Sequence, residues 1–149
     1  MGITSQQKGK LGELWVFGKL LAAGVNVYLP LVDEGIDAII RRSDRRLLEI
    51  QVKSTRAKDQ AGYFNAYLEP RKDLFVVCVD LSPLDETPSQ PPEVWIFPSE
   101  VFANREYSAR SKKGEYRLAL ASRSRRHGNK PRKEILRAYR EAWELLTGC

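Results

Sequence analysis

The sequence is short of cysteine and of long apolar runs, and each shortage excludes a class of protein. Cys78 and Cys149 are the only cysteines among 149 residues, so neither a disulfide framework nor a zinc site built on paired cysteines is predicted. No stretch approaches 18 consecutive apolar residues, which excludes a membrane span. The first residues, MGITSQQKGK, contain no hydrophobic signal region, so we expect a cytoplasmic protein with no membrane partner.

Several common catalytic patterns are also missing. The chain has no serine–histidine–acid set, no glycine-rich phosphate loop and no nicotinamide fingerprint, so nucleotide-cofactor chemistry is not indicated. The single histidine, His127, lies among arginines in SRSRRHGNK. A phosphate or solvent contact explains it better than a general base does.

Positive charge is concentrated in one segment. Residues 105–133 contain 11 Lys and Arg against two acids, a charge of +9, while the rest of the chain carries −3, for a net charge of +6. Such a segment attracts phosphate backbones through counterion release. A solvated charged face or a disordered loop is the alternative.

Hydrophobic periodicity predicts one α/β domain spanning residues 1–149. A helix is expected at 8–23, with its apolar face formed by residues 11, 14, 15, 18, 21 and 22. Strands are expected at 25–29, 36–41, 47–53, 63–68 (where a helical turn is the alternative), 74–81, 93–97 and 116–121. The remaining expectations are a proline-rich loop at 82–92, a short helix at 98–104, a basic loop at 108–113, a basic mobile segment at 122–133 and an amphipathic helix at 134–146.

The predicted hairpin of 36–41 and 47–53 carries an unusual polar face. Because side chains alternate along a strand, Glu49, Gln51 and Lys53 share one face and the apolar residues between them share the other. Asp37 lies on the partner strand, within cross-strand reach if its face matches. Burying such a set without a function is costly. The alternative is the solvated side of a half-buried hairpin.

These residue types fit magnesium chemistry on a phosphodiester. Mg²⁺ prefers oxygen ligands and binds through one or two carboxylates plus water and phosphate. Asp37 offers a carboxylate, Gln51 a neutral oxygen, and Lys53 an ammonium that positions water or offsets charge on the phosphate. Glu13, on the first helix, is a candidate second carboxylate. It is otherwise an ordinary exposed helix residue.

Together these motifs resemble a known family. A helix with Glu13, then Gly35-Ile36-Asp37, then Gln51-Val52-Lys53-Ser54-Thr55 is similar to the PD-(D/E)XK nuclease superfamily, in a subset where glutamine replaces the usual acid. That superfamily includes restriction enzymes, archaeal Holliday-junction resolvases and some homing endonucleases. The later segments VWIFPSEVF and ILRAYREAWELL resemble small single-domain members.

The resemblance implies a restriction endonuclease-like αβββ core, with a central mixed sheet flanked by an N-terminal and a C-terminal helix. It implies that Asp37 is the metal ligand, Gln51 occupies the acidic position, Lys53 is the catalytic lysine and Glu13 is the helix glutamate. Gln51 removes one ligand charge, which Glu49 or Glu13 would have to replace.

The leading prediction is therefore an endonuclease that depends on Mg²⁺ or Mn²⁺ and cleaves DNA. Many members of that superfamily act as dimers or larger assemblies, so the resemblance also allows a homodimer or homotetramer. Seven basic residues are predicted to contact DNA phosphates: Arg110, Lys112, Lys113, Arg123, Arg125, Arg126 and Lys130. Two alternatives stay open. One is a non-catalytic nucleic-acid-binding module with the same fold, and the other is an interaction protein whose basic segment meets an acidic protein surface.

Overall fold

The computed structural model describes residues 2–56 and 62–149. Within these ranges, the helices are α1 (Ser5–Ala22), α3 (Pro83–Glu86), α4 (Ser99–Phe102), α5 (Arg132–Ile135) and α6 (Glu144–Thr147), with 3-10 turns η1 (Arg125–His127) and η2 (Arg137–Tyr139). The strands are β1 (Asn26–Tyr28), β2 (Ala38–Arg41), β3 (Leu47–Thr55), β4 (Tyr63–Tyr67), β5 (Leu74–Asp80), β6 (Glu93–Pro98), β7 (Ser108–Arg110), β8 (Glu115–Ala119), β9 (Arg123–Ser124) and β10 (Lys130–Pro131).

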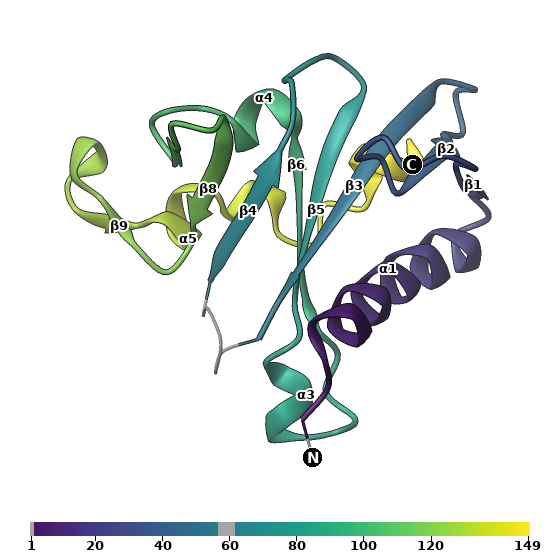
Figure 1. Ribbon diagram of the computed structural model, residues 1–149, viewed down its shortest axis with the longest axis horizontal. Helices are drawn as coiled ribbons and strands as arrows, with labels where there is room; N and C mark the ends of the chain where they lie inside the picture. Colours follow the sequence, from purple (N-terminus) through teal and green to yellow (C-terminus); the bar gives the residue numbers. More distant parts are fainter. Residues whose placement is uncertain (1, 57–61) are drawn as a thin grey trace.

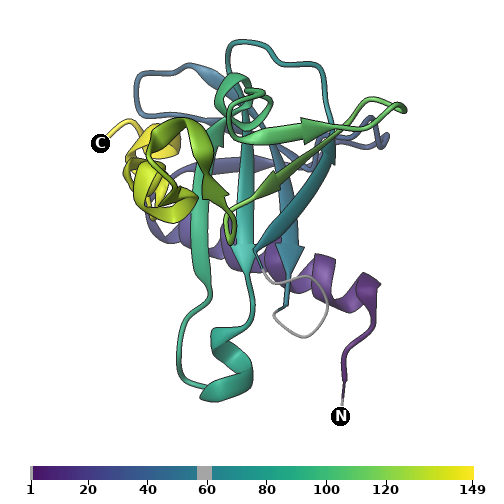
Figure 2. The ribbon, with the colours of Figure 1, turned by 90° about the vertical axis from the view of Figure 1, so that its left-hand side faces the viewer.

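The described strands form a central mixed sheet in the order β1-β2-β3-β5-β6. Its β3 and β5 are parallel and its other neighbours are antiparallel. A smaller antiparallel sheet, β4-β8-β7, lies on one side of the central sheet, and α1 lies on the other (Figures 1 and 2). The predicted α/β class and central mixed sheet are confirmed, as is the antiparallel β2–β3 hairpin.

The two faces of the central sheet pack against different partners. On the α1 face, Leu48, Ile50 and Val52 of β3 join one apolar cluster with Val16 and Leu20 of α1. The opposite face of β5 and β6 packs against β4 and β8 in a second cluster, which contains Val76, Cys78, Trp95, Phe97, Phe64 and Leu118. The even residues of β3 therefore face the helix, and its odd residues face the smaller sheet.

The first helix is present, but its predicted apolar face is wrong. Gly12, Val16 and Leu20 are buried, whereas Leu14 and Leu21 are each 60% exposed. Apolar residues occur around most of this helix, so the periodicity alone did not identify the packed face. Gly12 marks that face, because a Cβ there would lie 1.8 Å from Ser54 Oγ of β3.

Three segments expected to lack regular structure contain it. The proline-rich loop 82–92 includes α3, and the proline is at its first turn, where a missing N–H costs nothing. The basic loop 108–113 begins with β7, which pairs with β8. The segment 122–133, expected to be mobile, contains η1 and the β9–β10 pair. Short-range pairing of this kind leaves little periodic signal.

The amphipathic helix expected at 134–146 is also wrong, because the chain there is broken into α5, η2 and α6. Arg140 forms a β-bridge with Trp95 of β6. Glu141 has a φ of 50°. Its N–H donates to Val94 O at 2.8 Å, and its side-chain Oε1 accepts from Val94 N at 3.0 Å. The interruption thus satisfies the backbone of β6, which is the edge strand of the sheet.

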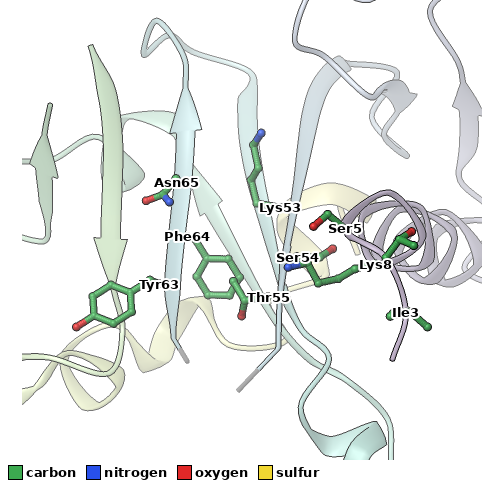
Figure 3. Close-up of a pocket in the computed structure, with 10 residues that line it drawn as sticks. Ile3, Ser5, Lys8, Lys53, Ser54, Thr55, Tyr63, Phe64 and Asn65 are labelled. Atoms are coloured by element: carbon green, nitrogen blue, oxygen red, sulfur yellow. The ribbon is translucent and has the colours of Figure 1, made fainter. Parts of the chain in front are cut away.

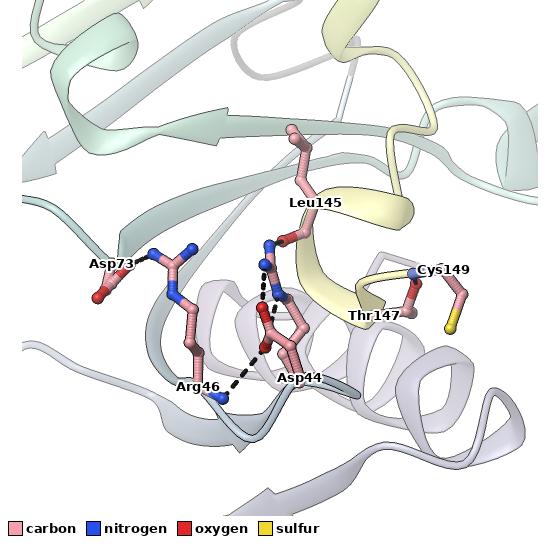
Figure 4. A network of polar contacts seen from close by, with 7 residues as sticks. Asp44, Arg46, Asp73, Leu145, Thr147 and Cys149 are labelled. Carbon is pink, nitrogen blue, oxygen red and sulfur yellow. Dashed lines mark hydrogen bonds and ion pairs between the residues drawn. The ribbon is translucent and has the colours of Figure 1, made fainter.

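The turn between β2 and β3 is attached to two other parts of the chain. Asp44 accepts from the side chain of Arg42, the main reason that the pKa of Asp44 falls to about 2. The side chain of Arg46 pairs with Asp73, just before β5, and Arg42 Nη1 lies 3.5 Å from the carbonyl of Leu145 (Figure 4). These contacts attach the turn of the β2–β3 hairpin to the segment before β5 and to α6.

No helix in the described part of the chain combines the length and the hydropathy that crossing a membrane requires.

Candidate active site

The site begins where β2 and β3 separate. Ala38, the first residue of β2, pairs with Ile50, while β3 continues to Thr55 without a partner on that side. The N–H of Asp37 donates to Ile50 O at 2.9 Å, and its carboxylate Oδ2 accepts from Val52 N at 2.6 Å. The side chain of Asp37 thus occupies the place of a backbone acceptor, which fixes its carboxylate at the fork between the strands.

Burial and neighbouring groups shift the pKa of Asp37. Burial is the main reason that its pKa rises to about 6, and the hydrogen bond from Val52 N–H opposes that rise. The carboxyl of Glu13 raises the pKa further, while the ammonium of Lys53 lowers it. Three of the four predicted catalytic residues, from α1, the fork and β3, are therefore close enough for Glu13 and Lys53 to shift the pKa of Asp37.

We call the hollow that is lined by the carboxylate residues Glu13, Asp33 and Asp37 the acidic pocket; its volume is about 280 Å³. Glu13 Oε2 lies 2.6 Å from Lys10 Nζ, and this contact raises the pKa of Lys10. Gly35 has a φ of 84° and donates its N–H to Asp33 Oδ1 at 2.9 Å, so a tight turn delivers the chain to Asp37. The pocket is lined by Lys10, Glu13, Phe17, Leu29, Pro30, Leu31, Asp33, Ile36 and Asp37.

The odd residues of β3 have separate environments. Gln51 is 6% exposed, and its Nε2 lies 3.5 Å from the carbonyl of Tyr67 in β4, which leaves Oε1 as the end that could bind a cation. Glu49 forms an ion pair with Arg71. Of the two predicted charge replacements, Glu13 lines the acidic pocket together with Asp37, whereas Glu49 does not.

Lys53 opens onto a second, larger hollow of about 770 Å³, which we call the basic pocket (Figure 3). It lies between the start of α1, the end of β3 and the start of β4, and is lined by Ile3, Thr4, Ser5, Lys8, Lys53, Ser54, Thr55, Tyr63, Phe64 and Asn65. Sequence reasoning missed Lys8 and Asn65. The sequence could have indicated Asn65, because it is a polar residue in a strand of alternating polarity. No pattern in the sequence indicated Lys8.

The residues around Asp37 fit a magnesium ion. Glu13 and Asp37 supply carboxylate oxygens to the acidic pocket, whereas Gln51 is not among the residues that line it. Burial is the main cause of the raised pKa of Asp37, and the nearby carboxyl of Glu13 adds to it, so a cation there would offset negative charge. No cluster of three or more His, Cys, Asp and Glu occurs within 2–56 and 62–149. The donor set thus resembles that of a largely hydrated Mg²⁺ rather than that of a fully protein-coordinated metal.

The seven predicted phosphate contacts lie apart from the acidic pocket. All are exposed and belong to the β7–β8 hairpin or to residues 123–130, and we call them the basic surface. Arg110 stacks over Tyr116 with 5.3 Å to the ring centroid, and Arg123 Nη1 donates to Asn129 O at 2.9 Å. The other members are Lys112, Lys113, Arg125, Arg126 and Lys130.

The contacts of His127 are with neighbouring side chains of the same region. Its ring stacks on Tyr107 with centroids 6.1 Å apart, and its Nδ1 lies 2.9 Å from Ser124 Oγ. These contacts hold η1 against the residue that precedes β7 and against β9, and His127 is not among the residues that line the acidic pocket.

No protein-family model matches the sequence, and no curated protein matches it either. Among solved structures, the bacterial homing endonuclease I-Ssp6803I is similar over 99% of this chain and 94% of its own, with 25% identity and a TM-score of 0.57. The chain shares the fold of this nuclease. The expected nuclease-like α/β architecture is thereby confirmed, while membership of the PD-(D/E)XK subset stays a prediction.

Proposed function

We propose that this protein is a magnesium- or manganese-dependent endonuclease that hydrolyses phosphodiester bonds in DNA. The observation that carries the proposal is the position of Asp37, held at the fork by Val52 N–H between Glu13 and Lys53. The shared fold with a homing endonuclease supports the same reaction class.

Each residue has a distinct role in this proposal. Asp37 and Glu13 would hold the cation, and Gln51 would offer Oε1 as a neutral ligand. The cation would polarise the phosphate and lower the pKa of a bound water. Lys53, within electrostatic reach of Asp37, would orient the attacking water and offset the charge that develops on the phosphate.

The basic surface would hold the DNA backbone. Its exposed guanidinium and ammonium groups suit phosphate contacts, which position a duplex without reading its sequence. Because the proposed substrate is DNA, we also propose an intracellular location.

We further propose that the protein assembles as a homodimer or homotetramer. One acidic pocket cuts one strand, so a double-strand break needs two. Leu14 and Leu21 of α1 are exposed apolar side chains outside the acidic pocket and are available for contact between copies. Light scattering at several protein concentrations measures the assembly.

A non-catalytic DNA-binding module is the second candidate, because Gln51 stands where an acid would add ligand charge. Magnesium-dependent cleavage of plasmid DNA separates the two. We expect cleavage by the wild type and a loss of about 10²–10³-fold in Asp37→Ala and Lys53→Ala. Glu100→Gln and Lys72→Gln are matched exposed controls that should cleave normally. DNA binding without cleavage by the wild type in either metal would favour the second candidate.

A further inference from the structure

The basic pocket contains more polar groups than its own chain satisfies. Within the described residues, Thr55 Oγ1, Ser54 Oγ and Asn65 Oδ1 are buried oxygens without a hydrogen-bond partner. Thr55 is only 6% exposed. Unpaired buried oxygens are uncommon. Ser54 Oγ packs against Gly12 of α1, so Thr55 Oγ1 and Asn65 Oδ1 are the two that indicate a group that the chain itself does not supply.

The start of α1 supplies unpaired donors to the same pocket. Thr4 accepts from Gln7 N at 3.1 Å and its carbonyl from Lys8 N at 2.9 Å. No acceptor in the described part of the chain meets the N–H groups of Ser5 and Gln6, and the first turn has no acidic residue. An 18-residue helix therefore presents its positive end and two free amides, which favours an anion.

Two lysines complete the surroundings. Figure 3 shows Lys8 extending from α1 toward the end of β3, and Lys53 lining the same hollow from β3. Lysine ammonium groups, helix amides and hydroxyls are the usual ligands of a phosphate.

We infer that the basic pocket is a phosphate subsite for the nucleic-acid strand, occupied by the phosphate next to the one being cleaved. Lys53 and Thr55 are two residues apart on β3, roughly 7 Å, which is comparable to the separation of successive phosphates in one strand. Lys53 serves the reacting phosphate, while Lys8, Thr55 and the amides of Ser5 and Gln6 hold its neighbour. This inference rests on the proposed function.

Two arms test it, both with the full-length chain. In the first, inorganic phosphate is titrated while backbone amide shifts are recorded by NMR, with chloride at equal ionic strength as control. Shifts at Ser5, Gln6 and Thr55 are expected, and weaker binding in Lys8→Gln and Thr55→Val. Thr55→Val should melt no lower than the wild type, because it removes an unpaired hydroxyl. No shift at these amides would overturn the subsite.

The second arm measures duplex binding without divalent metal. Lys8→Gln should lower affinity about eightfold at 0.1 M salt, the loss of one phosphate contact. Lys19→Gln, on the same helix but outside the pocket, is the matched control. A duplex with one neutral methylphosphonate linkage beside the cleavage site should bind wild type and Lys8→Gln equally. Equal losses for Lys8→Gln and Lys19→Gln would overturn the inference.

The arms also separate this inference from the proposed function. A wild type that cleaves DNA but shows no Lys8 effect overturns the subsite alone. A wild type that neither binds nor cleaves DNA overturns the proposed function, and phosphate shifts at Ser5 and Thr55 would then mark an anion site that does not serve nucleic acid.

Discussion

The acidic pocket and the basic surface differ in how far each side chain depends on its neighbours. In the acidic pocket, Asp37 is partly buried, its pKa is moved to about 6, and its orientation is set by Val52 and Glu13. On the basic surface the side chains are exposed, and contacts such as Arg110 over Tyr116 are local. Single substitutions in the acidic pocket are therefore expected to abolish its function, whereas each substitution on the basic surface should weaken DNA binding by a small step.

The largest expected effect on DNA affinity comes from removing several members of the basic surface together. The triple variant Arg123→Gln, Arg125→Gln and Arg126→Gln should reduce the slope of log affinity against log salt by about 2.7, which is a loss of about 500-fold in affinity at 0.1 M salt. Fluorescence anisotropy across a salt series measures it.

The matched control removes the same charge elsewhere, through Lys19→Gln, Arg41→Gln and Lys72→Gln, all exposed residues. Equal losses in both triple variants would show that net charge alone drives binding, and the basic surface would lose its separate status.

The second prediction sharpens the role of Gln51. Gln51→Glu places a buried carboxylate against the carbonyl of Tyr67 in place of the Nε2 donor, which should cost about 1–3 kcal/mol in metal-free buffer, or several degrees in Tm. Mg²⁺ should raise the Tm of the variant more than that of the wild type. Equal metal effects in thermal melts would remove Gln51 from the ligand set.

The third prediction concerns the packing that holds Glu13 over the fork. Gly12→Ala places a Cβ 1.8 Å from Ser54 Oγ and should destabilise by about 1–3 kcal/mol. Gly18→Ala meets no atom within 4 Å and should stabilise by about 0.5–1 kcal/mol. Urea unfolding of the pair measures the contrast, and similar values for both would mean that α1 does not depend on close approach at Gly12.

The smallest expected effect is the pH dependence of stability around Asp37. Its folded pKa of about 6 exceeds the unfolded value of about 3.9, so stability falls as pH rises through this window. Asp37→Asn carries no charge and keeps an acceptor for Val52 N–H. In EDTA it should melt about 1–2 °C above the wild type at about pH 8, a small gap because solvent screens the effect, and equally at about pH 3, below the unfolded pKa. A gap unchanged by pH would contradict the raised pKa.

The sequence predicted the strands better than the segments between them. Alternation along 47–53 and the apolar run at 74–81 gave β3 and β5 nearly to the residue, since sheet burial imposes a period of two. The helix expected at 134–146 was wrong because Arg140 and Glu141 pair with β6, a long-range contact with no local pattern.

For the site, residue type and strand period by themselves identified Asp37, Gln51 and Lys53 as one polar group, and the composition of 105–133 identified the basic surface. Only the tertiary structure decided which carboxylate accompanies Asp37. Glu49 shares a strand face with Gln51 but pairs with Arg71, while Glu13, 24 residues earlier in the chain, lies beside Asp37. The tertiary structure also forms the basic pocket. Lys8, Thr55 and Asn65 belong to three elements, which lie close together only because α1 and β4 pack around the end of β3. Periodicity is a property of one segment, whereas a pocket depends on the placement of several.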